Sequence, residues 1–235
     1  MPSNLTRKEL LKKDKFTVEA GHTVDYLSTH RKEVVRFGGI ALALIVLVAA
    51  VLYYRSSQLS VREQVLGEAI ALSSAPVGQA PAGGGINFPT QTAKDDAVTK
   101  AFTKLDSDYS GTEEAYIGEY YLAGKALDAG KVDDARKKYQ DVADHANANY
   151  ASLAKLALAQ LDFAENRLAE SEALLKDLMD HPTDLVSKTQ ATFSYAKVIS
   201  PTKPDEAKKL FLQLVSEKSE VAQVAVTAMN ELPQK

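Results

Sequence analysis

The order of apolar and polar positions divides the chain into one long hydrophobic stretch and a series of short helical segments. From Phe37 to Tyr54, 18 consecutive residues carry no charge. At about 1.5 Å per residue such a helix covers about 27 Å, close to the roughly 30 Å hydrocarbon core of a bilayer. Soluble helices rarely lack a polar face over so many turns. We therefore interpret residues 34–54 as a transmembrane helix rather than as a buried core helix.

In the second half, apolar residues recur with helical periodicity between breaks at glycine, asparagine and proline. Short connections between short helices are typical of stacked helical hairpins. The pattern therefore predicts an all-α fold. The predicted helices are 93–107, 113–128, 132–145, 149–164, 168–180, 185–199, 204–217 and 220–231.

A 36-residue period runs through this helical part. Three sets of positions keep their size class, one small and two large and apolar: Ala135/Ser171/Ala207, Tyr139/Leu175/Phe211 and Val142/Leu178/Leu214. The two large positions are three residues apart and so share one helix face. A period in the thirties built from helix pairs indicates a solenoid, whose curved surface usually binds partners.

At these residues the chain resembles a tetratricopeptide repeat. The third copy departs from the pattern, because Ser194 and Tyr195 stand where a large and a small residue are expected; a turn shortened by one residue would put Tyr195 and Ala196 there instead. Before the first copy, Phe102 and Leu105 look like the second helix of a partial repeat. The first copy is carried by Leu122, Ala123, Gly130, Ala135, Tyr139 and Val142, and the second by Leu158, Ala159, Asn166, Ser171, Leu175 and Leu178.

These patterns divide the chain into five parts. The predicted parts are an amphipathic cytoplasmic arm (1–33), a transmembrane helix (34–54), a juxtamembrane helix that continues it (55–72), a Pro/Gly-rich linker (73–92) and a tetratricopeptide-like helical-hairpin domain (93–235). The arm could lie on anionic lipid, dock on a protein or only lead into the span. The sequence leaves these three roles open.

The distribution of charge predicts which side of the membrane each part occupies. Eight Lys or Arg precede the apolar run, whereas the stretch 55–93 holds two. By the positive-inside rule the N-terminus is cytoplasmic and the repeat domain is translocated.

The part after the span has a net charge of −7, from 19 basic and 26 acidic residues in 56–235, which argues against nucleic acid as a partner. There is no cysteine for a disulfide or a lipid anchor, and no small-x-small site closely follows the apolar run, so we do not expect cleavage of a signal peptide.

The arrangement of arm, span, short helix and repeat domain resembles the ancillary subunits of the Sec translocon. That resemblance implies a single-pass bacterial inner-membrane protein with a periplasmic repeat domain, which associates with translocon subunits and periplasmic chaperones.

In the repeat family the first helix of each pair lines the concave groove. The interpretation as a partner-binding groove competes with simple packing against neighbouring helices. None of the matching positions is Lys or Arg, so the pattern does not predict a clamp for a terminal carboxylate. The matching positions are Ile117, Tyr120 and Leu127, then Leu153, Leu156, Gln160 and Phe163, then Thr189 and Thr192.

Nothing in the sequence predicts an enzyme, a metal site or a cofactor. The four histidines are scattered, without the i+3 or i+4 spacing of a metal pair. The segment 118–125 has the wrong glycine spacing for a phosphate-binding loop and is followed by Ala126. The paired acids Asp95-Asp96 and Asp133-Asp134 suit the first turns of helices, where carboxylates complement the helix dipole.

We therefore expect a non-enzymatic, membrane-anchored interaction scaffold for protein export. A scaffold for cell-envelope or division machinery is the main alternative, and a membrane-tethered enzyme is a weaker one.

Overall fold

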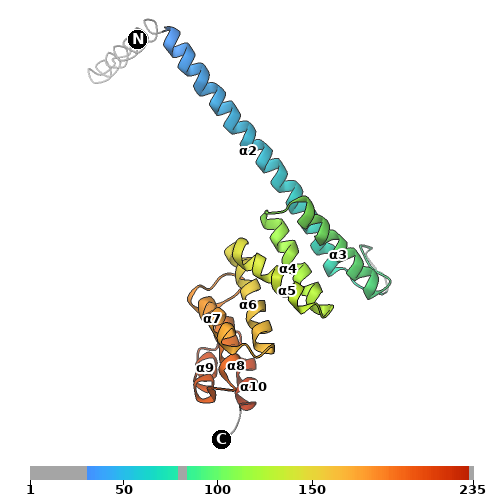
Figure 1. Cartoon of the computed structure of the whole chain (residues 1–235), viewed down its shortest axis with the longest axis vertical. Helices are drawn as coiled ribbons and strands as arrows, with labels where there is room; N and C mark the ends of the chain where they lie inside the picture. The colour runs from blue at the N-terminus through green and yellow to red at the C-terminus, as the bar shows by residue number, and fades with distance from the viewer. Residues whose placement is uncertain (1–30, 79–83, 233–235) are drawn as a thin grey trace, which may run out of the picture. The chain divides into compact units, whose positions relative to one another are not determined.

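The computed structural model describes residues 31–78 and 84–232, and Figure 1 shows its elements. All named elements in this part of the chain are α-helices, joined by turns and one isolated bridge between Val77 and Phe88. The all-α prediction is confirmed. The helices are α2 (Arg31–Ser74), α3 (Gln91–Asp108), α4 (Glu113–Asp128), α5 (Val132–His145), α6 (Ala148–Ala164), α7 (Leu168–Asp180), α8 (Lys188–Ile199), α9 (Pro204–Ser216) and α10 (Ala222–Asn230).

The chain divides into two units, residues 1–60 and 61–235, and each is described by itself. In the first unit, α2 carries the apolar run, whose side chains from Phe37 to Tyr53 are exposed. Within the described residues it is the one helix long and apolar enough to cross a membrane. Residues 1–30 of the arm predicted for 1–33 lie outside the described residues.

The second unit begins with a hairpin that the sequence only half predicted. Phe102 and Leu105 of α3 are fully buried, as expected for the second helix of a repeat. The first helix of that hairpin is the end of α2, where Ala69 is buried and Leu66 and Ile70 pack against the same cluster. Residues of the juxtamembrane segment thus belong to the solenoid, and the repeats begin before residue 93.

The described residues of the predicted linker hold this hairpin together. The Gly78 amide donates to the Phe88 carbonyl at 2.9 Å, and the Phe88 amide donates to the Pro76 carbonyl at 3.0 Å. At the base of α3, the Lys94 ammonium donates to the Ala75 carbonyl at 2.7 Å. These bonds close the connection from α2 to α3.

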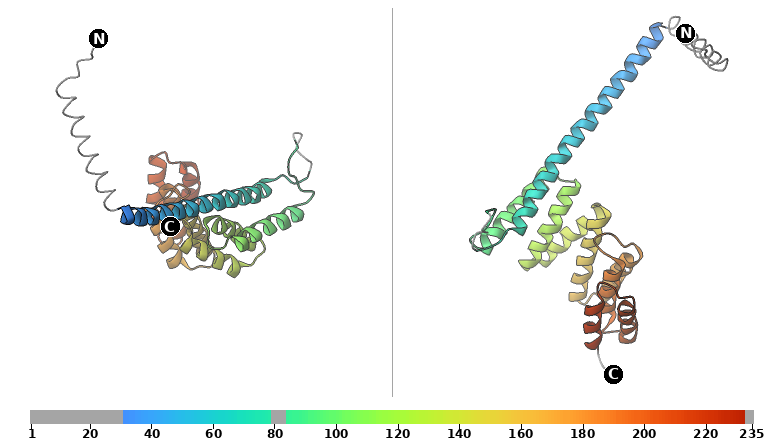
Figure 2. Two further views of the ribbon diagram at one scale, coloured as in Figure 1. Left: turned by 90° about the horizontal axis from the view of Figure 1, so that it is seen from above. Right: turned by 180° about the vertical axis from the view of Figure 1, so that it is seen from behind.

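Three further hairpins, α4/α5, α6/α7 and α8/α9, follow in chain order, with α10 packed on α9 (Figure 2). The N-terminus of each first helix is capped by a side chain that accepts hydrogen bonds from backbone amides. The capping residues are Thr112, Asn147 and Ser187. The turn within each of the first two hairpins contains a residue at positive φ, Gly130 (φ 72°) and Asn166 (φ 60°). Glycine and asparagine tolerate that conformation best, so the turns form where the sequence indicated.

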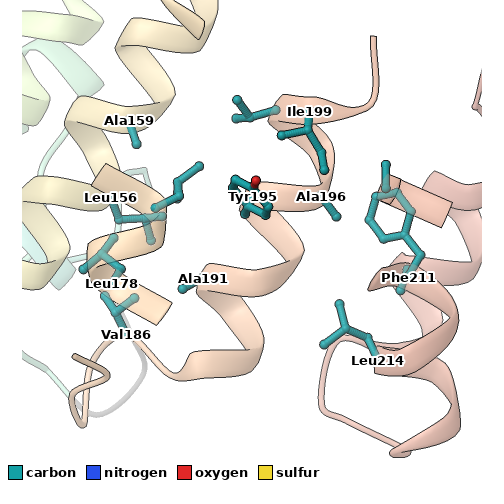
Figure 3. Close-up of a cluster of buried hydrophobic side chains, with 14 residues drawn as sticks. Leu156, Ala159, Leu178, Val186, Ala191, Tyr195, Ala196, Ile199, Phe211 and Leu214 are labelled. Atoms are coloured by element: carbon teal, nitrogen blue, oxygen red, sulfur yellow. The ribbon is translucent and has the colours of Figure 1, made fainter. Parts of the chain in front are cut away.

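The repeated positions form the core of each hairpin. All nine are buried, and Ala135, Ser171 and Ala207 are inaccessible to solvent. Figure 3 shows the last cluster, in which Tyr195 and Ala196 of α8 lie between α6 and α7 on one side and Phe211 and Leu214 of α9 on the other. The small residues allow paired helices to approach, and the large ones fill the space between them.

The third copy is out of register by one residue in its first helix. Tyr195 and Ala196 are buried as Leu122-Ala123 and Leu158-Ala159 are, at 5% and 0% exposed, whereas Ser194 is partly exposed. Twelve positions separate Ala123 from Ala135 and Ala159 from Ser171, but eleven separate Ala196 from Ala207. The shortened turn is therefore the arrangement that forms. The residues of α8 that correspond to those of α4 and α6 are therefore displaced by one position, which is about 100° around the helix.

Candidate partner-binding groove

The nine predicted groove residues lie on α4, α6 and α8 but differ in accessibility. Ile117, Leu156 and Thr192 are buried, so they belong to the helix packing rather than to a free surface. Tyr120, Leu153 and Thr189 are half-buried, and Leu127, Gln160 and Phe163 are exposed. Packing therefore accounts for the buried members of the set, whereas Leu127, Gln160 and Phe163 are accessible to solvent.

The junction of α4, α5 and α6 is filled by tyrosine rings. Tyr120 packs edge-on against Tyr139 of α5 at 5.5 Å between ring centroids and against Tyr150 of α6 at 5.9 Å. Burial raises the pKa of all three hydroxyls, that of Tyr139 to about 12. The rings close this junction and keep their protons at physiological pH.

On α8 the two predicted threonines make bonds within the chain. The Thr192 hydroxyl donates to the Lys188 carbonyl at 2.8 Å, and the Thr189 hydroxyl donates to the Glu220 carboxylate at 2.9 Å. Hydrogen bonds from Ser187 and Thr189 hold the pKa of Glu220 below its usual range.

Because of the one-residue register shift, Phe193 and Lys197 take the positions that correspond to Leu156 and Gln160 of α6. The 36-residue period could not find them; the Tyr195-Ala196 pair was the signal that could.

A cavity of about 200 Å³ lies at the junction of α6, α7 and α8. It brings two of the predicted groove residues together with side chains that the sequence reasoning missed. Its walls are mainly apolar, with two aromatic rings, one amide, one hydroxyl and one ammonium. The lining residues are Ala159, Gln160, Phe163, Leu175, Phe193, Ser194, Lys197 and Val198.

Lys197 is the charged residue of this cavity. Its ammonium lies 6.0 Å from the centre of the Phe193 ring, a distance at which a cation and an aromatic face attract each other. Within 31–78 and 84–232 no carboxylate lies within salt-bridge distance of Lys197, whereas Lys155 and Lys203, on and next to the same helices, are paired. The cavity therefore offers an apolar recess with an unneutralised cation at its wall.

A model of the tetratricopeptide repeat-like domain matches residues 37–184, which is more than half of the chain. The chain belongs to the tetratricopeptide repeat-like family. The match includes most of the apolar stretch of α2 and the first hairpins, and it ends in the loop before α8. No curated protein and no solved structure matches the chain.

Tetratricopeptide repeat-like domains generally serve protein–protein interaction through such stacked helices. In this member, α8 lies beyond the matched stretch and supplies half of the cavity wall. The residues that distinguish the cavity, Phe193 and Lys197, are thus contributed by the part of the chain where the register changes.

Several titratable side chains of this repeat-like domain have local partners. Within the described residues no three His, Asp or Glu side chains converge as a metal site would require. Asp95, in the second turn of α3 rather than the first, is hydrogen-bonded to Lys125, which lowers its pKa. Asp133 and Asp134 do lie in the first turn of α5, where their charge complements the helix dipole.

Glu119 of α4 is a partly buried acid with a raised pKa. Burial, followed by the adjacent Asp141 of α5, raises its pKa to about 7, and Lys138 at 3.8 Å opposes the change. Asp141 also contacts His145, whose ring stacks on Tyr116. None of these residues lines the α6/α7/α8 cavity, so this cluster bears on stability rather than on binding there.

Proposed function

We propose that this protein is a non-enzymatic, single-pass scaffold that binds other polypeptides at the junction of α6, α7 and α8. The observation that carries the proposal is the apolar cavity lined by Phe163 and Phe193, with Gln160, Ser194 and Lys197 as polar groups. Aromatic residues in a desolvated pocket are the usual anchors of a protein interface. A membrane-tethered enzyme is disfavoured, since the perturbed acid Glu119 lies away from this cavity.

The location follows from the charge pattern. We propose a bacterial inner-membrane protein with a cytoplasmic N-terminus and a periplasmic repeat domain, because the eight basic residues before the apolar run favour the cytoplasmic side. Protease added to spheroplasts should then degrade residues 93–235. Survival of that part, with loss of an external marker, would contradict the proposed topology.

For the partners, we propose subunits of the Sec translocon and periplasmic chaperones. The support is the order of an N-terminal arm, one apolar helix and tetratricopeptide repeats, which resembles the ancillary translocon subunits. A scaffold for cell-envelope or division machinery has the same architecture and is the second candidate.

Photo-crosslinking in cells separates the two candidates. A photoreactive residue at Ala43 in the apolar helix should capture translocon subunits, and one at Gln160 should capture exported or chaperone proteins. Lys100, exposed on α3, serves as the control position. Recovery of envelope-synthesis proteins from both positions without any translocon subunit would reject the translocon assignment and favour the second candidate.

A further inference from the structure

The size of the α6/α7/α8 cavity limits what it can hold. Pockets for cofactors and drug-sized molecules usually measure about 300–1,000 Å³, whereas this one measures about 200 Å³. It has room for one apolar side chain presented by a larger molecule. Its walls suit such a group, because the exposed Phe163 and the half-buried Phe193 present carbon surface, and the buried Leu175 and Val198 complete the apolar lining.

The single cation of the lining sets the charge that a bound segment should carry. The Lys197 ammonium has no carboxylate partner in the described part of the chain and is held near the Phe193 ring. Lys176, on the neighbouring helix α7, already contacts Glu172 and the Tyr195 ring. Lys197 is therefore the group left to pair with an acid from outside.

We propose that this cavity binds an internal segment of another polypeptide in which one apolar side chain is flanked by Asp or Glu. The apolar side chain enters the cavity against Phe163 and Phe193, and the neighbouring carboxylate pairs with Lys197. The amide of Gln160 and the hydroxyl of Ser194 stand at the same wall to bond the peptide backbone. An internal acid is the committed occupant, because one lysine matches one side-chain carboxylate and the cavity has room for one neighbouring apolar side chain; a chain terminus and a fatty acid present the same single carboxylate and are outcomes of the test.

This inference rests on the proposed function and adds the chemistry of the bound segment. It is tested on the full chain in lipid nanodiscs with a displayed library of random twelve-residue peptides that are blocked at both ends of the variable region. Recovered peptides are sequenced, and their dissociation constants are measured by fluorescence anisotropy. The expected consensus is a Leu, Met or Phe with Asp or Glu within two positions of it.

Two substitutions close the cavity by different routes. Leu175→Tyr fills it from the inside, and Gln160→Trp covers it from an exposed position, which keeps the test valid if the first variant folds poorly. Each should weaken the recovered peptides at least tenfold, because the burial of one apolar side chain is lost. An unchanged affinity in Gln160→Trp would overturn the cavity as the site while leaving a scaffold role intact.

Charge reversal tests the acidic requirement. Lys197→Glu should weaken acidic peptides about fivefold, as expected for a partly solvated ion pair, and should shift the selected consensus toward Lys or Arg. Lys188→Glu, on the first turn of the same helix and outside the cavity lining, is the matched control and should change nothing.

The remaining outcomes overturn the inference. A consensus without acids, or one unchanged in Lys197→Glu, would mean that Lys197 does not select the segment. Displacement of the peptides by decanoate would point to a fatty-acid site instead. Failure to enrich any peptide, while position 160 still crosslinks proteins in cells, would reject the peptide chemistry and leave the proposed function standing.

Discussion

The junction of α4, α5 and α6 and the junction of α6, α7 and α8 have the same design but differ in what fills them. Tyr139 and Leu175 occupy the same position of the 36-residue period, and both are buried. The Tyr139 hydroxyl reaches to 3.6 Å from where a Cβ on Gly124 would stand. At the second junction, Leu175 is shorter and Gln160 replaces the glycine, and a cavity of about 200 Å³ remains.

The size of the side chains at these two positions therefore affects how completely a repeat junction is filled. The ring of Tyr139 packs with Tyr120, whereas Leu175 is a smaller buried side chain that lines the cavity. The two junctions also differ in their ionic links, since Asp162 at the end of α6 corresponds to Ile199 of α8 in the shifted register. The first junction is thus filled by a buried ring and held by an ionic link, whereas the second keeps a cavity.

The largest expected effect is the loss of the tyrosine that closes the first junction. Tyr139→Ala should lower the free energy of unfolding by about 3–5 kcal/mol, because it removes a buried ring and leaves a cavity. Urea unfolding of the full chain, followed by circular dichroism, measures this. A loss below about 1 kcal/mol would show that the first junction is not held by this ring.

The ionic link of the first junction comes next. Asp162 is 5% exposed and accepts bonds from Arg136 at 2.7 Å and from Arg167 at 2.7 and 3.0 Å. Asp162→Asn should destabilise the chain by about 2–3 kcal/mol, since both guanidinium groups lose a buried charged partner. Asp144→Asn, an exposed acid on α5, is the control and should change stability by less than about 0.5 kcal/mol.

The pH dependence of stability tests the role of Glu119 in the α4/α5 hairpin. Because the pKa of Glu119 is raised in the folded state to about 7, the folded chain binds this proton more tightly than the unfolded chain does. The contribution of Glu119 to the free energy of unfolding therefore decreases as pH rises from about 4.5 to about 7. Above about pH 7 the ionised carboxylate destabilises the folded chain by its full amount. Glu119→Gln should stabilise the chain by about 1 kcal/mol at pH 8 and flatten this slope; an identical slope in the variant would exclude Glu119 as its source.

The smallest expected effect comes from making the second junction resemble the first. Leu175→Tyr should change stability by less than about 1 kcal/mol, because the cavity can accept the ring. Leu178→Tyr, at a fully buried position outside the cavity lining, should cost about 1–3 kcal/mol through overpacking. Equal losses in the two variants would argue that the cavity cannot accommodate a ring.

Much of the fold could be predicted from local signals. Gly130 and Asn166 mark turns that need positive φ, and the bounds predicted for α4, α5 and α7 match the structure. The buried repeat positions followed from size and spacing alone. Long-range pairing could not be predicted in the same way. The end of α2 and α3 share one buried cluster that includes Ala69 and Phe102, and no local spacing encodes that.

The candidate site could be predicted only in part, and for a geometrical reason. Gln160 and Phe163 lie on α6, where the 36-residue period holds, and both line the cavity. Phe193 and Lys197 lie on α8, which starts at Lys188 after the Ser187 cap. There the helix is displaced by one residue relative to the period, so the same reasoning selected Thr189 and Thr192. The tetratricopeptide-like pattern thus predicted the cavity residues of α6 but not those of α8.

We expect the open junction to bind other polypeptides and the filled junction not to. The most direct measurement places one photoreactive phenylalanine derivative at Phe163 or at Leu127, which occupy the same repeat position and are 37% and 36% exposed. We predict protein adducts in cells from position 163, lost in the Leu175→Tyr background, and few from position 127. Equal adducts from both positions, or adducts at 163 that persist with Leu175→Tyr, would contradict the account.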